Sequence, residues 1–119
     1  MSKRVSGKIF QGTGKRLDIQ RIAQIKSAAR VPLTLHGGSG TDDDDLGKAI
    51  AAGINIIHVN TELRVAWRDG LEEGLAKQPD EVVPYKILPF AVESVKKVAR
   101  SRLKLFNAHK VARTPEARD

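Results

Sequence analysis

The chain has 119 residues, about the size of one small domain, and is too short for a complete (β/α)₈ barrel, which needs about 250 residues. It is 40% hydrophobic and 29% charged, an ordinary composition for a soluble domain, and no apolar run approaches the roughly 20 residues of a membrane span. It contains no cysteine, which excludes disulfides and thiolate metal sites, and its basic start, MSKRVSGKIF, lacks the apolar core of a secretory signal. We therefore expect a cytoplasmic protein.

The net charge of +7 raises the question of nucleic-acid binding. Much of the excess follows Ser94, in KKVARSRLKLFNAHKVAR. The chain has only one Trp, one Tyr and three Phe, however, and a stacking platform for single strands needs more aromatic residues. The pattern favours a solvated basic helix face over a nucleic-acid site, and anionic substrates such as sugar phosphates are a third use for the charge.

The first part of the chain predicts a strand, a helix and a second strand. RVSGKIFQGTGKR is typical of a short strand followed by a glycine-rich loop, and VPLTLH is typical of a strand with proline at its entry. Between them, LDIQRIAQIKSAAR has helical periodicity, and Asp18 is suited to cap the first turn. The apolar stripe of this helix consists of Ile19, Ile22, Ala23 and Ala29.

A second helix, a third strand and a third helix are predicted next. The helix TDDDDLGKAIAAG begins with a capping box between Thr41 and Asp44, and Gly53 is suited to close it. INIIHVNT is a β-branched run of strand length. The third helix, ELRVAWRDGLEEGLAKQ, carries a full apolar stripe made of Leu63, Ala66, Trp67, Gly70, Leu71, Gly74 and Leu75.

The remainder predicts a proline-punctuated loop, PDEVVPYKILP, and a last amphipathic helix from Pro89 to Asn107. We expect residues 1–107 to form the folded part and residues 108–119 a flexible basic tail. Strands that alternate with helices at this spacing predict an α/β protein with about three parallel strands. So few strands leave two sheet edges and apolar helix surface uncovered, so we expect a homo-oligomer, a complementing chain or a poorly stable fold.

Two strand ends carry the candidate site. In LHGGSG, His36 ends a strand, the glycines let backbone N–H groups approach an anion, and Ser39 adds a hydroxyl. In HVNTEL, His58, Asn60 and Thr61 stand where the next strand gives way to a helix. The motif suits an anion beside a metal ligand or an acid–base imidazole, although such a turn is also common as a plain tight connection.

The stretch from LDIQRIAQIKSAAR through LHGGSG to VNTEL resembles the C-terminal part of class II, zinc-dependent fructose-bisphosphate and tagatose-bisphosphate aldolases. AIAAGI and the closing KVARSRLKLFN are similar too, so the likeness covers roughly Gly7 to Phe106. The resemblance implies the C-terminal βα units of a TIM barrel, here incomplete. It also implies reversible, zinc-assisted cleavage of a ketose bisphosphate into dihydroxyacetone phosphate and an aldehyde.

The resemblance assigns roles to individual residues. His36 matches the last zinc-binding histidine of the family's three. Gly37 and Ser39 match positions that hold dihydroxyacetone phosphate and, in some members, a monovalent cation, and Asn60 and Thr61 match the phosphate and substrate loop. His58 stands where the family usually has an asparagine that touches the substrate.

The departures from the family limit what the isolated chain is expected to do. The first zinc histidine and its neighbouring catalytic aspartate belong to a strand that this sequence lacks, and Ser6 stands at the apparent place of the middle zinc histidine. One imidazole does not replace a three-histidine site, so we expect the isolated chain to be inactive without a complementing segment. A non-catalytic phosphate-binding or self-assembly module derived from the barrel is the alternative.

Overall fold

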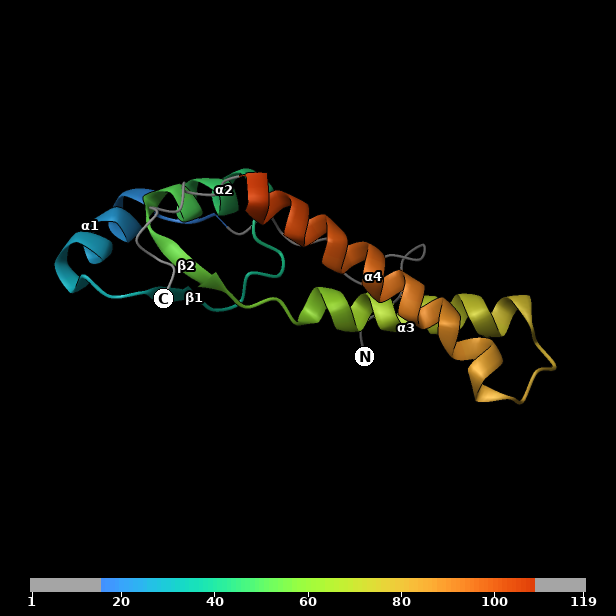
Figure 1. The fold of residues 1–119 in the computed structure, drawn as a ribbon. Helices are drawn as coiled ribbons and strands as arrows, with labels where there is room; N and C mark the ends of the chain where they lie inside the picture. The colour runs from blue at the N-terminus through green and yellow to red at the C-terminus, as the bar shows by residue number, and fades with distance from the viewer. Residues whose placement is uncertain (1–15, 109–119) are drawn as a thin grey trace.

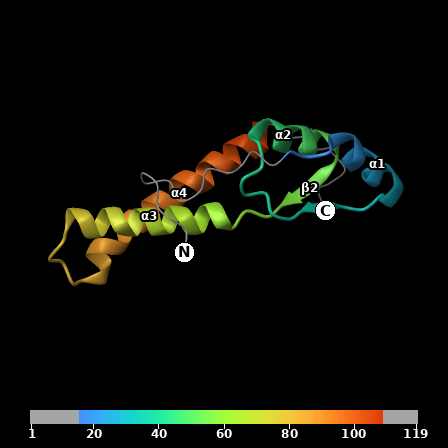
Figure 2. The same ribbon diagram turned by 180° about the vertical axis from the view of Figure 1, so that it is seen from behind.

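The computed structural model describes residues 16–108, and within this range it contains four helices and two strands. The protein is elongated, with extents of 58 × 38 × 19 Å and a radius of gyration of 18.2 Å. A compact domain of this length has a radius of gyration of about 13.5 Å. One end holds α1, α2 and the strands, and a hairpin of α3 and α4 projects from it (Figures 1 and 2).

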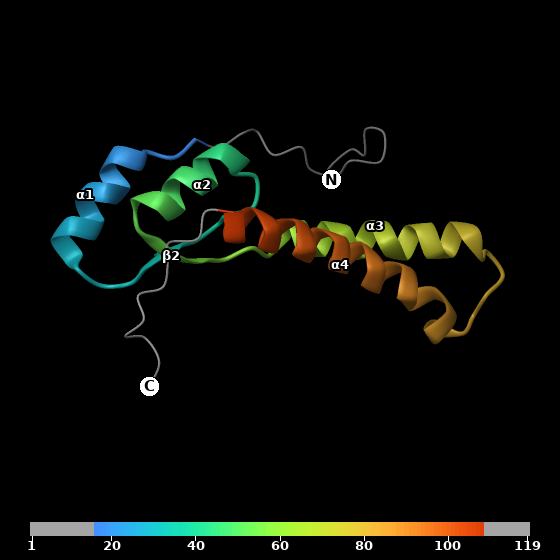
Figure 3. The same cartoon turned by 45° about the horizontal axis from the view of Figure 1, so that its top comes forward.

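The first part is an α/β unit. It consists of α1 (Ile19–Ala29), β1 (Leu33–Leu35), α2 (Asp43–Ala52) and β2 (Ile54–Ile57). The two strands pair in parallel, as the alternation of strands and helices predicts, and α1 and α2 lie together on one side of them (Figure 3). Asp18 caps α1 as expected. The strand predicted in RVSGKIFQG lies outside the described residues.

The start of α2 corrects one prediction, because Asp42 is the N-cap and Thr41 is not. The Asp42 carboxylate accepts hydrogen bonds from the backbone N–H groups of Asp44 and Asp45, at 3.0 and 3.1 Å. Thr41 is buried in the preceding loop. An aspartate is at least as good an N-cap as a threonine, so the helix starts one residue later than the capping box predicts. At the other end, Gly53 closes the helix with a φ of 123°, as expected.

The second part is the helical hairpin of α3 (Thr61–Lys77) and α4 (Pro84–Ala108). The two helices approach closely because α3 presents small residues to α4. A Cβ atom added to Gly70 would lie 2.5 Å from the backbone oxygen of Phe90, and Gly74 is similarly close to α4. The apolar stripe predicted for this helix is therefore partly correct, since its small members form the contact.

The N-terminus of α4 corrects a second prediction, because the helix begins at Pro84 rather than Pro89. Proline is tolerated in the first turn, where its missing N–H would be unpaired anyway. Pro89 then lies inside the helix, where it removes one backbone hydrogen bond without ending the helix. The helix ends at Ala108, one residue beyond the predicted folded part, and the rest of the predicted tail lies outside the described residues.

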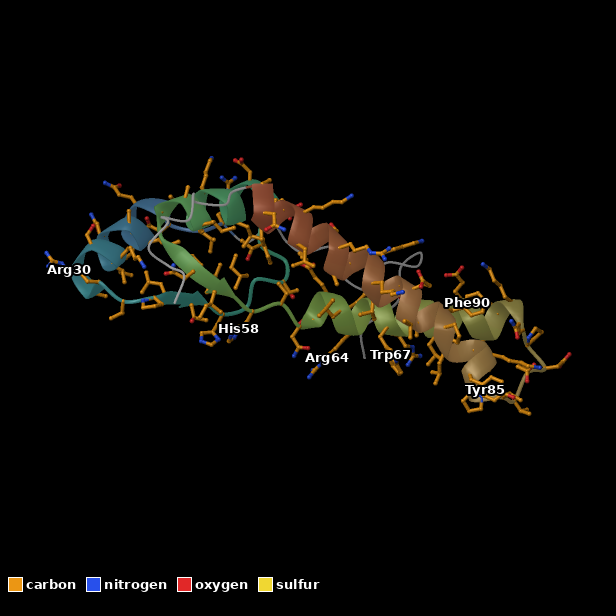
Figure 4. The ribbon with its side chains drawn as sticks, viewed as in Figure 1. Arg30, His58, Arg64, Trp67, Tyr85 and Phe90 are labelled. Atoms are coloured by element: carbon orange, nitrogen blue, oxygen red, sulfur yellow. The ribbon has the colours of Figure 1, made fainter. Side chains whose placement is uncertain are left out.

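The core of the described residues is small. Its buried apolar residues are Leu46, Ala49, Ile54, Ala66, Ile87 and Ala91. Large apolar side chains are left on the surface, such as Trp67, which is 48% exposed, and Tyr85, which is 75% exposed (Figure 4). No residue of α1 is buried, so its apolar stripe is only partly covered. None of the described helices is long and apolar enough to cross a membrane.

Candidate functional site

Two backbone hydrogen bonds join the segments that follow the two strands. The N–H of His58 donates to the carbonyl oxygen of Leu35 at 3.0 Å, and the N–H of Gly38 donates to the carbonyl oxygen of His58 at 3.0 Å. The glycine-rich turn after β1 is therefore held against the segment that connects β2 to α3. This is the carboxyl end of the parallel strands, where ligands bind in open α/β sheets.

The side chains of His36 and His58 meet at this edge. Their ring centroids lie 4.8 Å apart and the ring planes cross at 83°, an edge-to-face contact. Both residues are exposed, and Figure 4 shows His58 at the junction of β2 and α3. Strand β1 ends at Leu35 and β2 at Ile57, so each histidine follows its strand rather than forming part of it as predicted.

Two glycines make the close approach possible. Gly37 has a φ of 67°, in the left-handed region that favours glycine. At Gly38 an added Cβ would lie 2.8 Å from the Cγ2 atom of Ile57 and 3.1 Å from the carbonyl oxygen of His58. A side chain at position 38 would therefore push the two connecting segments apart.

Ser39 links the glycine-rich turn to the N-terminus of α3. Its Oγ atom accepts a hydrogen bond from the backbone N–H of Glu62 at 3.3 Å. Asn60 is the N-cap residue of α3, but its side chain makes no capping hydrogen bond. The first turn of α3, beginning at Thr61, thus has N–H groups and the positive end of the helix dipole directed toward the loops.

The N-terminus of α2 is a poorer place for an anion. The Asp42 carboxylate already accepts from two of its N–H groups, and further aspartates stand in its first turn. These negative charges would repel a phosphate. An anion bound at this edge therefore fits the start of α3 better than the start of α2.

Arg102 of α4 connects the hairpin to the site. Its Nη1 atom donates to Oδ1 of Asp43 at 2.8 Å, and its Nε atom forms an ion pair with Oε2 of Glu62 at 3.1 Å. The Arg102 side chain is only 19% exposed. The guanidinium offsets the negative charge of Glu62 beside the first turn of α3. Sequence reasoning missed this residue, because no local pattern relates positions so far apart in the chain.

Asp45, in the first turn of α2, carries a buried charge. Its carboxylate accepts from the backbone N–H of Leu17 at 2.9 Å and pairs with the Arg16 guanidinium at 2.8 Å. The Leu17 hydrogen bond, together with Arg16, holds the pKa of the Asp45 carboxyl below its ordinary value of 3.8. Asp45 therefore joins the segment before α1 to α2. Its carboxylate is occupied by these structural contacts.

Metal-binding groups are of two kinds here. Carboxylate oxygens of Asp42, Asp44 and Asp45 lie within 4.8 Å of one another, but each carboxylate has a partner within the protein, and such hard ligands suit Mg²⁺ or Ca²⁺ better than zinc. The imidazoles of His36 and His58 suit zinc in kind. The described residues place two imidazoles at this edge, fewer than the three zinc histidines implied by the resemblance.

All the predicted site residues lie in the described part of the chain, and the structure brings them to one edge. The two histidines are in ring contact, Ser39 bonds to the first turn of α3, and Asn60 and Thr61 start that helix. Gly37 shapes the turn between them. Their roles in binding remain predictions, as does the place of Ser6, which lies outside the described residues.

Comparisons with known proteins show which family of enzymes this chain resembles. A family model described as fructose-bisphosphate aldolase class-II matches residues 5–110. A fructose-bisphosphate aldolase of Ureaplasma parvum serovar 3 is 31% identical over 105 residues, covering 84% of this chain and 36% of the relative. A sulfofructosephosphate aldolase of Alkalicoccus urumqiensis is 36% identical over 98 residues, covering 82% of this chain and 34% of the relative.

A third relative is named for a substrate that differs from those in the names of the first two. The 6-phospho-5-dehydro-2-deoxy-D-gluconate aldolase of Shouchella clausii is 35% identical over 104 residues, covering 87% of this chain and 35% of the relative. The chain thus spans about a third of the length of the curated relatives that it matches. The names of all three describe aldolases that act on phosphorylated compounds.

Proposed function

The chain belongs to the class II fructose-bisphosphate aldolase family, and we propose that it supplies the phosphate-holding edge of a class II aldolase barrel. The reaction would be the reversible cleavage of a ketose bisphosphate into dihydroxyacetone phosphate and an aldehyde. The chain forms the last βα units of such a barrel, and a complementing segment supplies the rest. Sugar phosphates of this kind, and the absence of cysteine, fit a cytoplasmic enzyme.

The hydrogen bond from the Glu62 N–H to Ser39 Oγ is the observation that carries this proposal. It holds the glycine-rich turn against the first turn of α3, so that backbone amides and a hydroxyl converge where the phosphate would lie. Gly37, Asn60 and Thr61 border the same place, and His58 adds a hydrogen-bonding ring. A helix N-terminus with such donors favours a phosphate group.

His36 would be one of the zinc ligands. Bound zinc would polarise the ketone carbonyl of the substrate. The residues of this chain would hold the phosphate end of the same molecule, so that its carbonyl group stays near the imidazole. A monovalent cation beside Gly37 and Ser39 remains part of the expectation.

Titration with dihydroxyacetone phosphate tests the binding role. The full chain should bind it weakly, and Ser39→Ala should weaken binding roughly fivefold, as expected for the loss of one hydrogen bond of about 1 kcal/mol. Ser27→Ala is the matched control, because Ser27 is an exposed serine on α1, outside the loops that follow the strands. Equal affinities of the Ser39 and Ser27 variants would contradict the proposed phosphate site.

The catalytic part of the proposal needs a complementation experiment. The N-terminal segment of a class II aldolase, mixed with this chain and zinc, should cleave a ketose bisphosphate, whereas neither piece alone should do so. No cleavage of fructose or tagatose bisphosphate, in a mixture shown by sedimentation to associate, would refute the catalytic role.

The exposed apolar side chains favour a second candidate function, a self-assembling module. Trp67, Leu75 and Leu103 are each close to half exposed or more on the hairpin. A discrete oligomer formed without metal or phosphate would support this role, and a monomer at all concentrations in sedimentation velocity would exclude it.

A further inference from the structure

We propose that His36 and His58 together form a two-histidine site for a transition-metal ion such as Zn²⁺ or Ni²⁺. The family resemblance assigns a metal only to His36, so His58 is the new ligand. The site does not rest on the proposed function, because two imidazoles bind such an ion whether or not a substrate or a complementing segment is present.

The separation of the two rings fits a shared ion. Zinc binds imidazole nitrogen at about 2.0–2.1 Å, so two rings on one tetrahedral ion have centroids about 5 Å apart. The observed separation of the His36 and His58 centroids is 4.8 Å. Both side chains are exposed, so side-chain rotation can direct one nitrogen of each ring at a shared ion.

The rings have no competing hydrogen bonds within the described part of the chain. Neither imidazole donates to or accepts from a protein group there, and their contact with each other is the interaction that the structure shows. In many metal sites one ring nitrogen binds the ion and the other binds water or a protein group. Both nitrogens of His36 and His58 are thus available for these roles.

The backbone holds the two ligands in place before any ion binds. The His58 N–H bonds to the residue before His36, and the His58 carbonyl accepts from Gly38, two residues after His36. The backbone at Gly38 packs closely against Ile57 and His58, which brings the two segments together. A preorganised pair of ligands loses little conformational entropy on binding.

The chemistry of the donors selects the metal. Imidazole suits Zn²⁺, Cu²⁺ and Ni²⁺, whereas Mg²⁺ and Ca²⁺ prefer oxygen ligands. Two imidazoles fill two positions of a four-coordinate ion, which leaves two positions for water or for an oxygen of a bound anion. His58 would therefore add an ion ligand at a place where the resemblance expects an amide that touches the substrate.

Zinc titration of the full chain, followed by NMR of the histidine rings, tests the site. The chain has three histidines, and the third, His109, provides an internal control. The ring signals of His36 and His58 should shift together and saturate near one equivalent of Zn²⁺, while those of His109 should not follow them. This measurement requires no variant, so it remains decisive if a substitution disturbs folding.

Variants then assign the ligands. His36→Asn and His58→Asn should each weaken Zn²⁺ and Ni²⁺ binding at least about tenfold, since even outer-shell partners of a metal ligand contribute 10–100-fold. His109→Asn should leave the affinity unchanged, and an excess of Mg²⁺ should not compete. The proposal is overturned if His58→Asn binds zinc as tightly as the unchanged chain, if only the His36 ring responds, or if Mg²⁺ displaces the ion.

Discussion

Replacing Gly70 by alanine tests the claim that the hairpin depends on close contact between α3 and α4. An added Cβ would lie 2.5 Å from the Phe90 carbonyl oxygen, 2.7 Å from Cα of Ala91 and 2.8 Å from Cβ of Ser94. Ordinary contacts start at 3.4 Å, so the oxygen would have to move by about 0.9 Å. Two of the three atoms belong to the backbone of α4 and cannot rotate away.

Two effects oppose each other in this variant. Alanine has a higher helix propensity than glycine, which would stabilise α3 by about 1 kcal/mol. Overpacking costs about 1–3 kcal/mol, and a clash with backbone atoms belongs at the upper end of that range. We therefore expect Gly70→Ala to lower the free energy of unfolding by about 1–2 kcal/mol.

Urea unfolding followed by circular dichroism measures this change. Gly74→Ala is the matched comparison, because its Cβ would meet the Ile87 oxygen and the Phe90 ring at 2.9 Å each, and the ring is able to move. Gly74→Ala should therefore destabilise less than Gly70→Ala. The reasoning is refuted if Gly70→Ala is as stable as the unchanged chain, or more stable.

Two further substitutions probe the α/β unit. Leu46→Ala should lower the free energy of unfolding by about 2–5 kcal/mol, because Leu46 is fully buried. Leu103→Ala, at an exposed position, should lower it far less. Similar urea midpoints for the two variants would contradict this prediction. The pKa of Asp45 is lowered on folding, so its stabilising contribution is complete above the ordinary value of 3.8 and is lost as the pH falls through the lower folded pKa. Asp45→Asn should remove this part of the acid profile measured by thermal unfolding, and an unchanged profile would exclude the role given to Asp45.

The local elements of the fold follow from local signals. Asp18 before an apolar-periodic run and Gly53 after one mark helix ends correctly, and the two predicted strands that fall in the described residues are in the right places. The two errors in where a helix starts both come from competing signals. Asp42 outcompetes Thr41 as a cap, and Pro84 starts a helix although prolines were expected to keep the segment in a loop.

The features of the site that could not be predicted from the sequence depend on contacts between residues far apart in the chain. The parallel arrangement predicts that the segments after two strands meet, and His36 and His58 do so. Their ring contact depends on a register set by hydrogen bonds between the segments, which no residue pattern specifies. Arg102 reaches an aspartate 59 positions away, so its part in the site follows only from the way in which α4 folds back along α3.

The position of Ser39 and Arg102 at the base of α3 has a mechanical consequence. The helix has 17 residues and so extends about 26 Å from this base. A rotation of about 10° at the base would displace the far end by about 4–5 Å, so the length of the hairpin would amplify any small rotation at its base. A distance label near the tip of the hairpin would then report events at the imidazoles without being attached to them.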